Sequence, residues 1–112
     1  MAYNPKLGLK LAQLLAKRKG VTQKFMFGGV AYMLNGHMFV GIVKDDLMVR
    51  VGPDAHDRLV KAPHARTMDF TGRPMKGYIF VSPDGWKTSA SLAKWVGHGE
   101  KFVLTLPAKK KK

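Results

Sequence analysis

Residues 25–51, FMFGGVAYMLNGHMFVGIVKDDLMVRV, decide the fold of this 112-residue chain. Two polar reversals divide the stretch into three apolar runs, which predicts three short strands. The first reversal is Asn35-Gly36, and because both residues tolerate positive φ, a two-residue type I′ hairpin fits there without strain. The second reversal is Lys44-Asp45-Asp46. Such a meander needs cover for its apolar face, so we expect a helix on either side of it.

The first helix is expected from Asn4 or Pro5 to about Lys19, with Gly20 as its C-cap. Residues 17–19, KRK, would then lie at the negative end of the helix dipole, a structural reason for their charge. The helix is amphipathic, because four leucines recur at helical spacing: Leu7, Leu11, Leu14 and Leu15.

The last helix is expected from Thr88 or Ser89, either of which can serve as N-cap, to about Leu106. Gly97 and Gly99 are unusual in it, since each costs about 1 kcal/mol against alanine in a helix interior. Either the helix bends there, or a strand or partner backbone approaches closely. An apolar stripe should lie across the sheet: Leu92, Trp95, Val96, Gly99, Phe102, Val103 and Leu106.

Between these regions we expect a short helix that begins at Pro53 or Asp54 and stops at Ala62-Pro63. Two further strands follow, 67–70 and 76–81, separated by a turn at 71–74. The predicted order is α-β-β-β-α-β-β-α. This is an α+β fold with an antiparallel sheet of about five strands, covered by the N- and C-terminal helices.

One domain is expected over 1–108, followed by a disordered lysine tail at 109–112. The chain has no cysteine, which excludes disulfides, thiolate zinc sites and cysteine nucleophiles. No run approaches the roughly 18 apolar residues that would span a bilayer, and no export signal is recognisable. We therefore expect a cytoplasmic protein without membrane contact.

The net charge of +13 is concentrated at the ends of the chain. Residues 25–108 hold ten basic and seven acidic side chains, so solvated ends explain most of the excess. Contact with nucleic acid or an acidic partner remains an alternative. Arg50 or Arg66 could instead pair with Asp69 across the sheet. The candidate contact residues are Lys17, Arg18, Lys19, Lys24, Arg50, Arg66, Arg73 and Lys76.

Signals for catalysis, cofactors or metals are weak. Gly28-Gly29 continues into strand rather than into a helix start, so a bulge or a close helix–strand approach explains it better than a phosphate loop. No two of the four histidines stand at a metal-ligand spacing. We expect no enzyme, cofactor or metal. A small-molecule-binding domain is the further alternative, with a closed pocket between sheet and last helix near Gly28 and Trp95.

Methionines are frequent in the predicted strands, and we expect most of them to fill the core. An excess beyond the helix-covered face would instead mark an oligomer interface, because methionine suits adaptable contacts. The residues concerned are Met26, Met33, Met38, Met48, Met68 and Met75.

Four motifs, in order, resemble the TfoX N-terminal domain family: MFGGVAYMLNGHMF, LMVRVGPDA, PHARTMDFTGRPMKGYIFV and LAKWV with a closing LTLP. The resemblance implies an α+β domain in a family linked by name to regulation of competence for DNA uptake in bacteria. Members with that role carry a second, helical domain, so a stand-alone N-terminal domain is expected here. The matching motif residues are Phe27, Gly28, Gly29, Asn35, Gly36, Gly72 and Pro74.

These observations together favour a non-enzymatic, single-domain regulatory or adaptor protein that acts by protein contact. A homodimer is one form such contact could take, through the methionine-rich sheet or through the glycine-bearing last helix.

Overall fold

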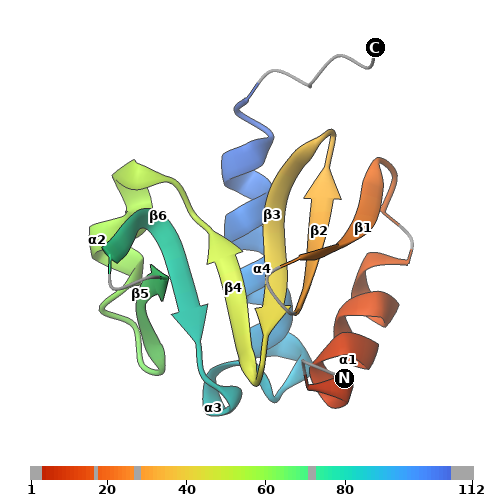
Figure 1. The fold of residues 1–112 in the computed structure, drawn as a ribbon, viewed down its shortest axis with the longest axis horizontal. Helices are drawn as coiled ribbons and strands as arrows, with labels where there is room; N and C mark the ends of the chain where they lie inside the picture. Colours follow the sequence, from red (N-terminus) through yellow and green to blue (C-terminus); the bar gives the residue numbers. More distant parts are fainter. Residues whose placement is uncertain (1–3, 17, 27–28, 71–72, 107–112) are drawn as a thin grey trace.

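The computed structural model describes residues 4–16, 18–26, 29–70 and 73–106, with the backbone alone at 26, 68–70 and 73–76. The elements occur in the following order (Figure 1): α1 Pro5–Leu15, β1 Val21–Met26, β2 Gly29–Leu34, β3 His37–Val43, β4 Asp46–Arg50, α2 Pro53–Leu59, β5 Ala65–Phe70, β6 Arg73–Val81, α3 Pro83–Trp86 and α4 Ser89–Val103.

The strands form one sheet in the order β1-β2-β3-β4-β6-β5, and every neighbouring pair is antiparallel. The α+β prediction is confirmed, with six strands rather than about five. The additional strand is β1, which pairs with β2 so that Met26 lies opposite Gly29. Gly28-Gly29 was expected to continue into strand, but Gly29 begins a new, antiparallel strand, and residue 28 lies outside the described residues.

Both predicted reversals of the meander are confirmed by the backbone. Asn35 and Gly36 have φ values of 54° and 86°, the pair of positive angles that a type I′ hairpin requires. Lys44 has a φ of 55° at the second reversal. Gly29 is required by close packing within the sheet, because a Cβ there would lie 1.9 Å from the Ile42 carbonyl oxygen.

The first helix begins as predicted and ends earlier. The Asn4 side chain caps it, accepting hydrogen bonds from the backbone N–H groups of Lys6 and Leu7 at 2.8 and 3.3 Å. It ends at Leu15 rather than near Lys19, so Arg18 and Lys19 lie beyond its last turn. The chain beyond Leu15 is held elsewhere: Gly20 accepts a backbone hydrogen bond from Asn35 at 3.1 Å, next to the first hairpin.

The last helix also begins as predicted, since the Thr88 hydroxyl accepts a 3.1 Å hydrogen bond from the Ser91 N–H. It ends at Val103 rather than Leu106. Gly99 allows β3 to approach α4 closely, because a Cβ there would lie 2.6 Å from the Phe39 carbonyl oxygen. Gly97 meets nothing within 4 Å.

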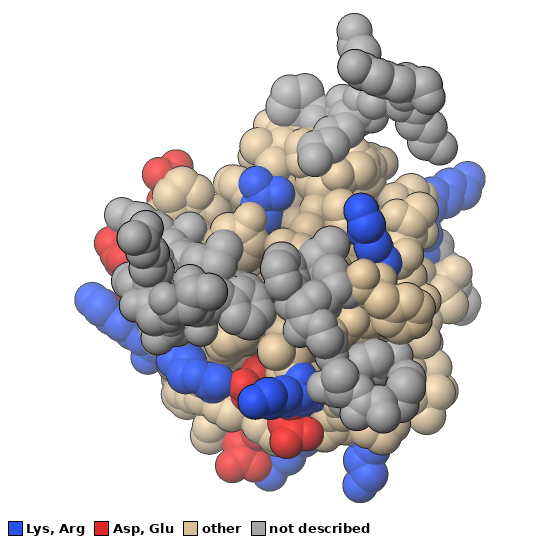
Figure 2. All heavy atoms as spheres, viewed as in Figure 1, with Lys and Arg blue, Asp and Glu red and all other residues tan. Residues whose placement is uncertain are grey.

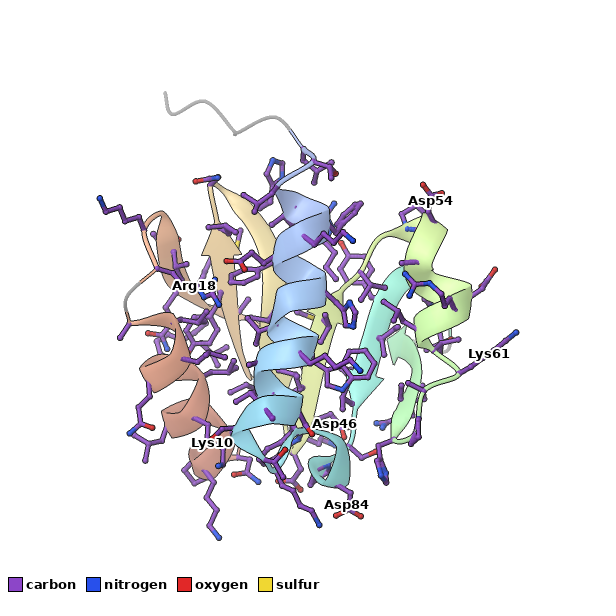
Figure 3. The ribbon with its side chains drawn as sticks, turned by 180° about the vertical axis from the view of Figure 1, so that it is seen from behind. Lys10, Arg18, Asp46, Asp54, Lys61 and Asp84 are labelled. Carbon is purple, nitrogen blue, oxygen red and sulfur yellow. The ribbon has the colours of Figure 1, made fainter. Side chains whose placement is uncertain are left out.

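The helices lie on one face of the sheet, where α4 runs between α1 and α2 (Figure 3). Of the seven residues in the expected stripe of α4, Phe102 and Leu106 are partly buried and the other five are buried. The other face carries no helix among the described elements (Figure 1). The largest fully buried side chains between helices and sheet are Phe39, Leu7, Leu11, Ile42, Leu47, Ile79, Val40, Val49, Val81, Val96 and Val103.

Candidate functional site

The helix-free face of the sheet carries its own apolar cluster. Successive side chains of a strand point to opposite faces of the sheet. Leu47 and Val49 face the core beneath the helices, so Met48 between them points to the helix-free face. On β6, Phe80 likewise points to the helix-free face, while its neighbours Ile79 and Val81 face the core. Met48 and Phe80 are only 3% and 7% exposed. We call this group the open-face cluster, and it consists of Met38, Val43, Met48, Tyr78 and Phe80.

The described methionine side chains do not fill the core beneath the helices, the role that was expected of most of them. Among the described side chains, the core beneath the helices contains no methionine. Met38 and Met48 belong to the open-face cluster instead, and Met33 is half-buried. The side chains of the other three methionines in the strands lie outside the described residues. Met38 and Met48 therefore lie beyond the helix-covered face, the placement expected from the sequence for a contact surface.

Arginines cover the rim of the open-face cluster. The Arg66 guanidinium lies 5.2 Å from the centre of the Phe80 ring and pairs with Asp46, Nη2 to Oδ2 at 2.5 Å. Arg66 thus reaches from β5 across β6 to β4. The pairing of Arg50 or Arg66 with Asp69 considered from the sequence involves a side chain outside the described residues. Arg50 lies 5.7 Å from the Tyr78 ring centre and 5.3 Å from that of Phe102.

The other predicted contact cations are dispersed. Arg18 pairs with Glu100 of α4, which fastens the segment after α1 to the last helix. Lys19 and Lys24 are exposed. Lys24 lies on β1 and Arg66 on β5, the two edges of the sheet, separated by five strand spacings of about 4.8 Å, or roughly 24 Å. Lys17 lies outside the described residues, as do the side chains of Arg73 and Lys76.

The candidate cations therefore do not form one patch in the described part of the chain. Figure 2 shows Lys and Arg side chains scattered over the view of the helix-free face, with Asp and Glu between them. Two of the arginines are already in ion pairs with carboxylates, and a third is stacked between aromatic rings. These three have structural roles that do not require a ligand.

The histidines lie on different elements, and within the described residues no three metal-binding side chains gather. His56 is buried on α2, where its ring nitrogens lie 3.3 Å from Asp57 Oδ1 and 3.4 Å from Thr67 Oγ1. Its place is therefore between α2 and β5, rather than on a mostly polar helix surface. His64 is in the loop before β5, and His37 begins β3.

The space between α4 and the sheet is filled by side chains. Leu92, Val96 and Val103 are at most 2% exposed, and the Gly99 backbone lies against β3. A closed pocket near Trp95 was the condition for the small-molecule alternative. The hollows that Trp95 and its neighbours line are instead open clefts on the flank of α4.

Two adjoining clefts of about 280 and 310 Å³ separate α2 from α4 and share Leu59 and His98. Together they form a groove that we call the α2–α4 groove. Sequence reasoning missed it, because its walls come from segments about 40 residues apart. One signal was present in the last helix: Lys94, His98 and Lys101 recur at spacings of four and three, which places them on one helix face.

The pKa of His98 is affected by the charges around this groove. Burial lowers the pKa of its imidazole below the ordinary value of 6.5. Repulsion between positive charges lowers that pKa further, and the cations responsible are Lys94, Arg58 and Lys101. Within the described residues none of these three cations forms an ion pair. Three cations and two carboxylates, Asp54 and Asp84, line the two clefts, so the groove has an excess of positive charge.

No helix in the described ranges is both long and apolar enough to cross a membrane. A search of curated proteins and a search of solved structures found no match. The family model described as the TfoX N-terminal domain matches residues 13–102. That span contains β1 to β6, both reversals of the meander and most of α4. The chain therefore belongs to the TfoX N-terminal domain family.

Proposed function

We propose that this chain is a non-enzymatic regulatory or adaptor domain, related to bacterial competence regulators, that acts in the cytoplasm by protein contact through the open-face cluster. The observation that carries the proposal is the placement of Met38, Val43, Met48, Tyr78 and Phe80 on a sheet face without a helix. An antiparallel sheet with one uncovered face usually presents polar residues there. Met38, Val43 and Tyr78 are partly exposed there around the buried Met48 and Phe80, and partly exposed apolar side chains grouped in this way suit a surface that meets a partner.

The composition of the cluster suits an adaptable partner surface. Methionine is flexible and polarisable, so Met38 and Met48 can adjust to different contours. Aromatic and arginine side chains are enriched at protein interfaces, and Tyr78, Phe80 and Arg66 supply both kinds here. A second copy of the chain is one such partner, since two sheets can pack face to face about 10 Å apart.

The size of the face favours weak association. Strands of about six residues are about 20 Å long, and six strands side by side are about 24 Å across. The area of this face is therefore smaller than the roughly 800 Å² that each partner buries in a stable complex. We therefore expect an exchanging contact rather than a permanent dimer.

Two of the seven acidic side chains have structural contacts, which agrees with the proposed role without catalysis. Asp46 and Glu100 are each held by an arginine, Arg66 and Arg18 respectively, in contacts that join neighbouring elements. General acid–base catalysis needs such a group free to exchange a proton with a substrate. Binding of nucleic acid, the alternative function, has less support, because two of the predicted cations, Lys24 and Arg66, lie at opposite edges of the sheet.

The test is sedimentation equilibrium between about 5 and 500 µM, the range in which weak association is visible. The wild-type chain is expected to self-associate, and Met38→Glu to remain monomeric because it places a charge in the cluster. Leu104→Glu is the matched control, since Leu104 is 59% exposed at the end of α4 and is not a member of this cluster. A wild-type chain that stays monomeric throughout and binds no protein partner would contradict the proposal.

A further inference from the structure

We propose that the α2–α4 groove binds a short acidic segment of a partner protein. This inference does not rest on the proposed function, because the groove lies on the helix side of the sheet and the open-face cluster on the other. It would make the domain a two-sided adaptor, with an apolar contact on one face and an acidic peptide held on the other.

The walls of the groove supply the positive charge. Arg58 comes from α2 and Lys94 and Lys101 come from α4, and all three are exposed, so their charged groups are accessible to a ligand. Within the described residues they have neither ion-pair partners nor hydrogen-bonded carboxylates. This distinguishes them from Arg18 and Arg66, which are already neutralised.

The floor of the groove is apolar and aromatic. Leu59 and Trp95 line one cleft, and Leu59 and Phe102 line the other, with the His98 imidazole between them. The Trp95 and His98 rings meet edge to face, with their centres 5.6 Å apart. A floor of this kind accepts an apolar side chain, which a peptide can supply next to its charged residues. The combination favours a peptide with both kinds of residue.

The carboxylates around the groove limit the length of that segment. Asp54 and Asp84 line the outer part of each cleft and are labelled at opposite ends of the groove in Figure 3. Asp84 pairs with Lys87 at 3.4 Å, and Asp57, which also lies on α2, contacts His56. Between these acidic ends, Lys94 and Lys101 are seven residues apart on α4, or about 10 Å along the helix axis.

A span of about 10 Å corresponds to about three residues of extended peptide. The expected ligand therefore has two or three acidic residues around one apolar side chain, and it has no further acidic residue beyond either end, where Asp54 or Asp84 would repel it. Nucleic acid carries an uninterrupted row of charges and fits this pattern poorly.

The experiment is selection of random 16-residue peptides, displayed on phage, against the full purified chain. Counter-selection uses the double variant Lys94→Glu, Lys101→Glu, in which two exposed side chains are changed so that the core is not disturbed. Lys61→Glu is the matched control: Lys61 is exposed and points away from the groove in Figure 3. All variants keep the terminal lysines, so any contribution from that tail is equal in each.

Selected peptides are expected to carry two or three acidic residues flanking an apolar one. Their affinity, measured by fluorescence anisotropy, should fall at least about tenfold on the double variant and less than about twofold on Lys61→Glu, since close charge contacts dominate such binding. Met38→Glu, which tests the open face, should bind them as the wild type does.

Two results would overturn the proposal. The first is that the selected peptides lack the acidic pattern or bind the double variant with unchanged affinity. The second is that a single-stranded oligonucleotide of random sequence binds more tightly than the peptides and depends on Lys94 and Lys101, which would assign the groove to nucleic acid.

Discussion

The two faces of the sheet pack their apolar side chains in different ways. On the helix side, branched aliphatic side chains and Phe39 fill the space so closely that Gly99 is needed to let α4 approach β3. On the open side, Met48 and Phe80 are buried among the partly exposed Met38, Val43 and Tyr78, and arginines lie over the aromatic rings. The first face is specified by shape, and the second stays adaptable, which suits a surface that exchanges partners.

The largest expected effect contrasts one side chain from each face. Phe39→Ala should lower the free energy of unfolding by about 3 to 5 kcal/mol, because it leaves a cavity in the dense core. Met48→Ala should cost less than about 2 kcal/mol, since its flexible neighbours can close over the space. Urea denaturation measures both. Equal losses would show that the two faces are packed alike.

A second contrast uses the two glycines of α4. Gly99→Ala should destabilise the fold by about 1 to 3 kcal/mol, because the new methyl group would meet the Phe39 carbonyl oxygen. Gly97→Ala should stabilise it by up to about 1 kcal/mol, because that position is open and alanine favours the helix. Thermal denaturation of the pair checks the close approach. Stabilisation by both substitutions would be incompatible with it.

On the open face, Arg66→Met should have a smaller effect. The ion pair with Asp46 is about half exposed on the arginine side, and such pairs contribute about 0 to 1 kcal/mol. The substitution should nevertheless expose Phe80, and so strengthen binding of a hydrophobic dye such as ANS. Lys44→Met, at an exposed turn, is the control that removes a charge without uncovering the cluster.

The smallest effect concerns His98 on the helix side. Its pKa is lowered in the folded state, so the unfolded chain takes up the proton more readily. The stability that this provides is present above about pH 6.5 and is lost as the pH falls below that value. The unfolding free energy of His98→Gln should therefore depend less on pH between about 7 and 5 than that of the wild type.

The cause of the shift can be tested separately by NMR titration of the His98 ring. Lys94→Gln or Lys101→Gln should raise its pKa, because each removes a repelling charge, whereas Lys61→Gln should leave it in place. An unchanged titration in both groove variants would remove the electrostatic argument for that groove.

Local signals in the sequence were sufficient for much of the fold. The hairpin at Asn35-Gly36 depends on two residues that accept positive φ, and the starts of α1 and α4 depend on Asn4 and Thr88 as caps. The first strand was missed because VTQKFM is an edge strand, mostly exposed, whose alternation of apolar residues is weak. The end of α1 was misplaced because contacts with distant residues decide it.

The candidate sites depend on tertiary placement and were less accessible from sequence. The sheet order puts Lys24 and Arg66 at opposite edges, which no local pattern contains. The sequence indicated the open-face cluster only indirectly, through the expectation that an excess of methionines beyond the helix-covered face would mark an oligomer interface. The α2–α4 groove joins Arg58 to Lys94 across about 40 residues, so only their spatial arrangement reveals a shared charge.

The central claim, that partners dock on the helix-free face, is tested most directly by NMR of the chain with 13C-labelled methionine methyl groups in a dilution series. The account predicts that the Met38 and Met48 methyl signals shift or broaden as concentration rises, while the indole signal of the buried Trp86 stays constant. Methionine methyl signals that do not change, with shifts confined to residues of α1 or α4, would contradict it.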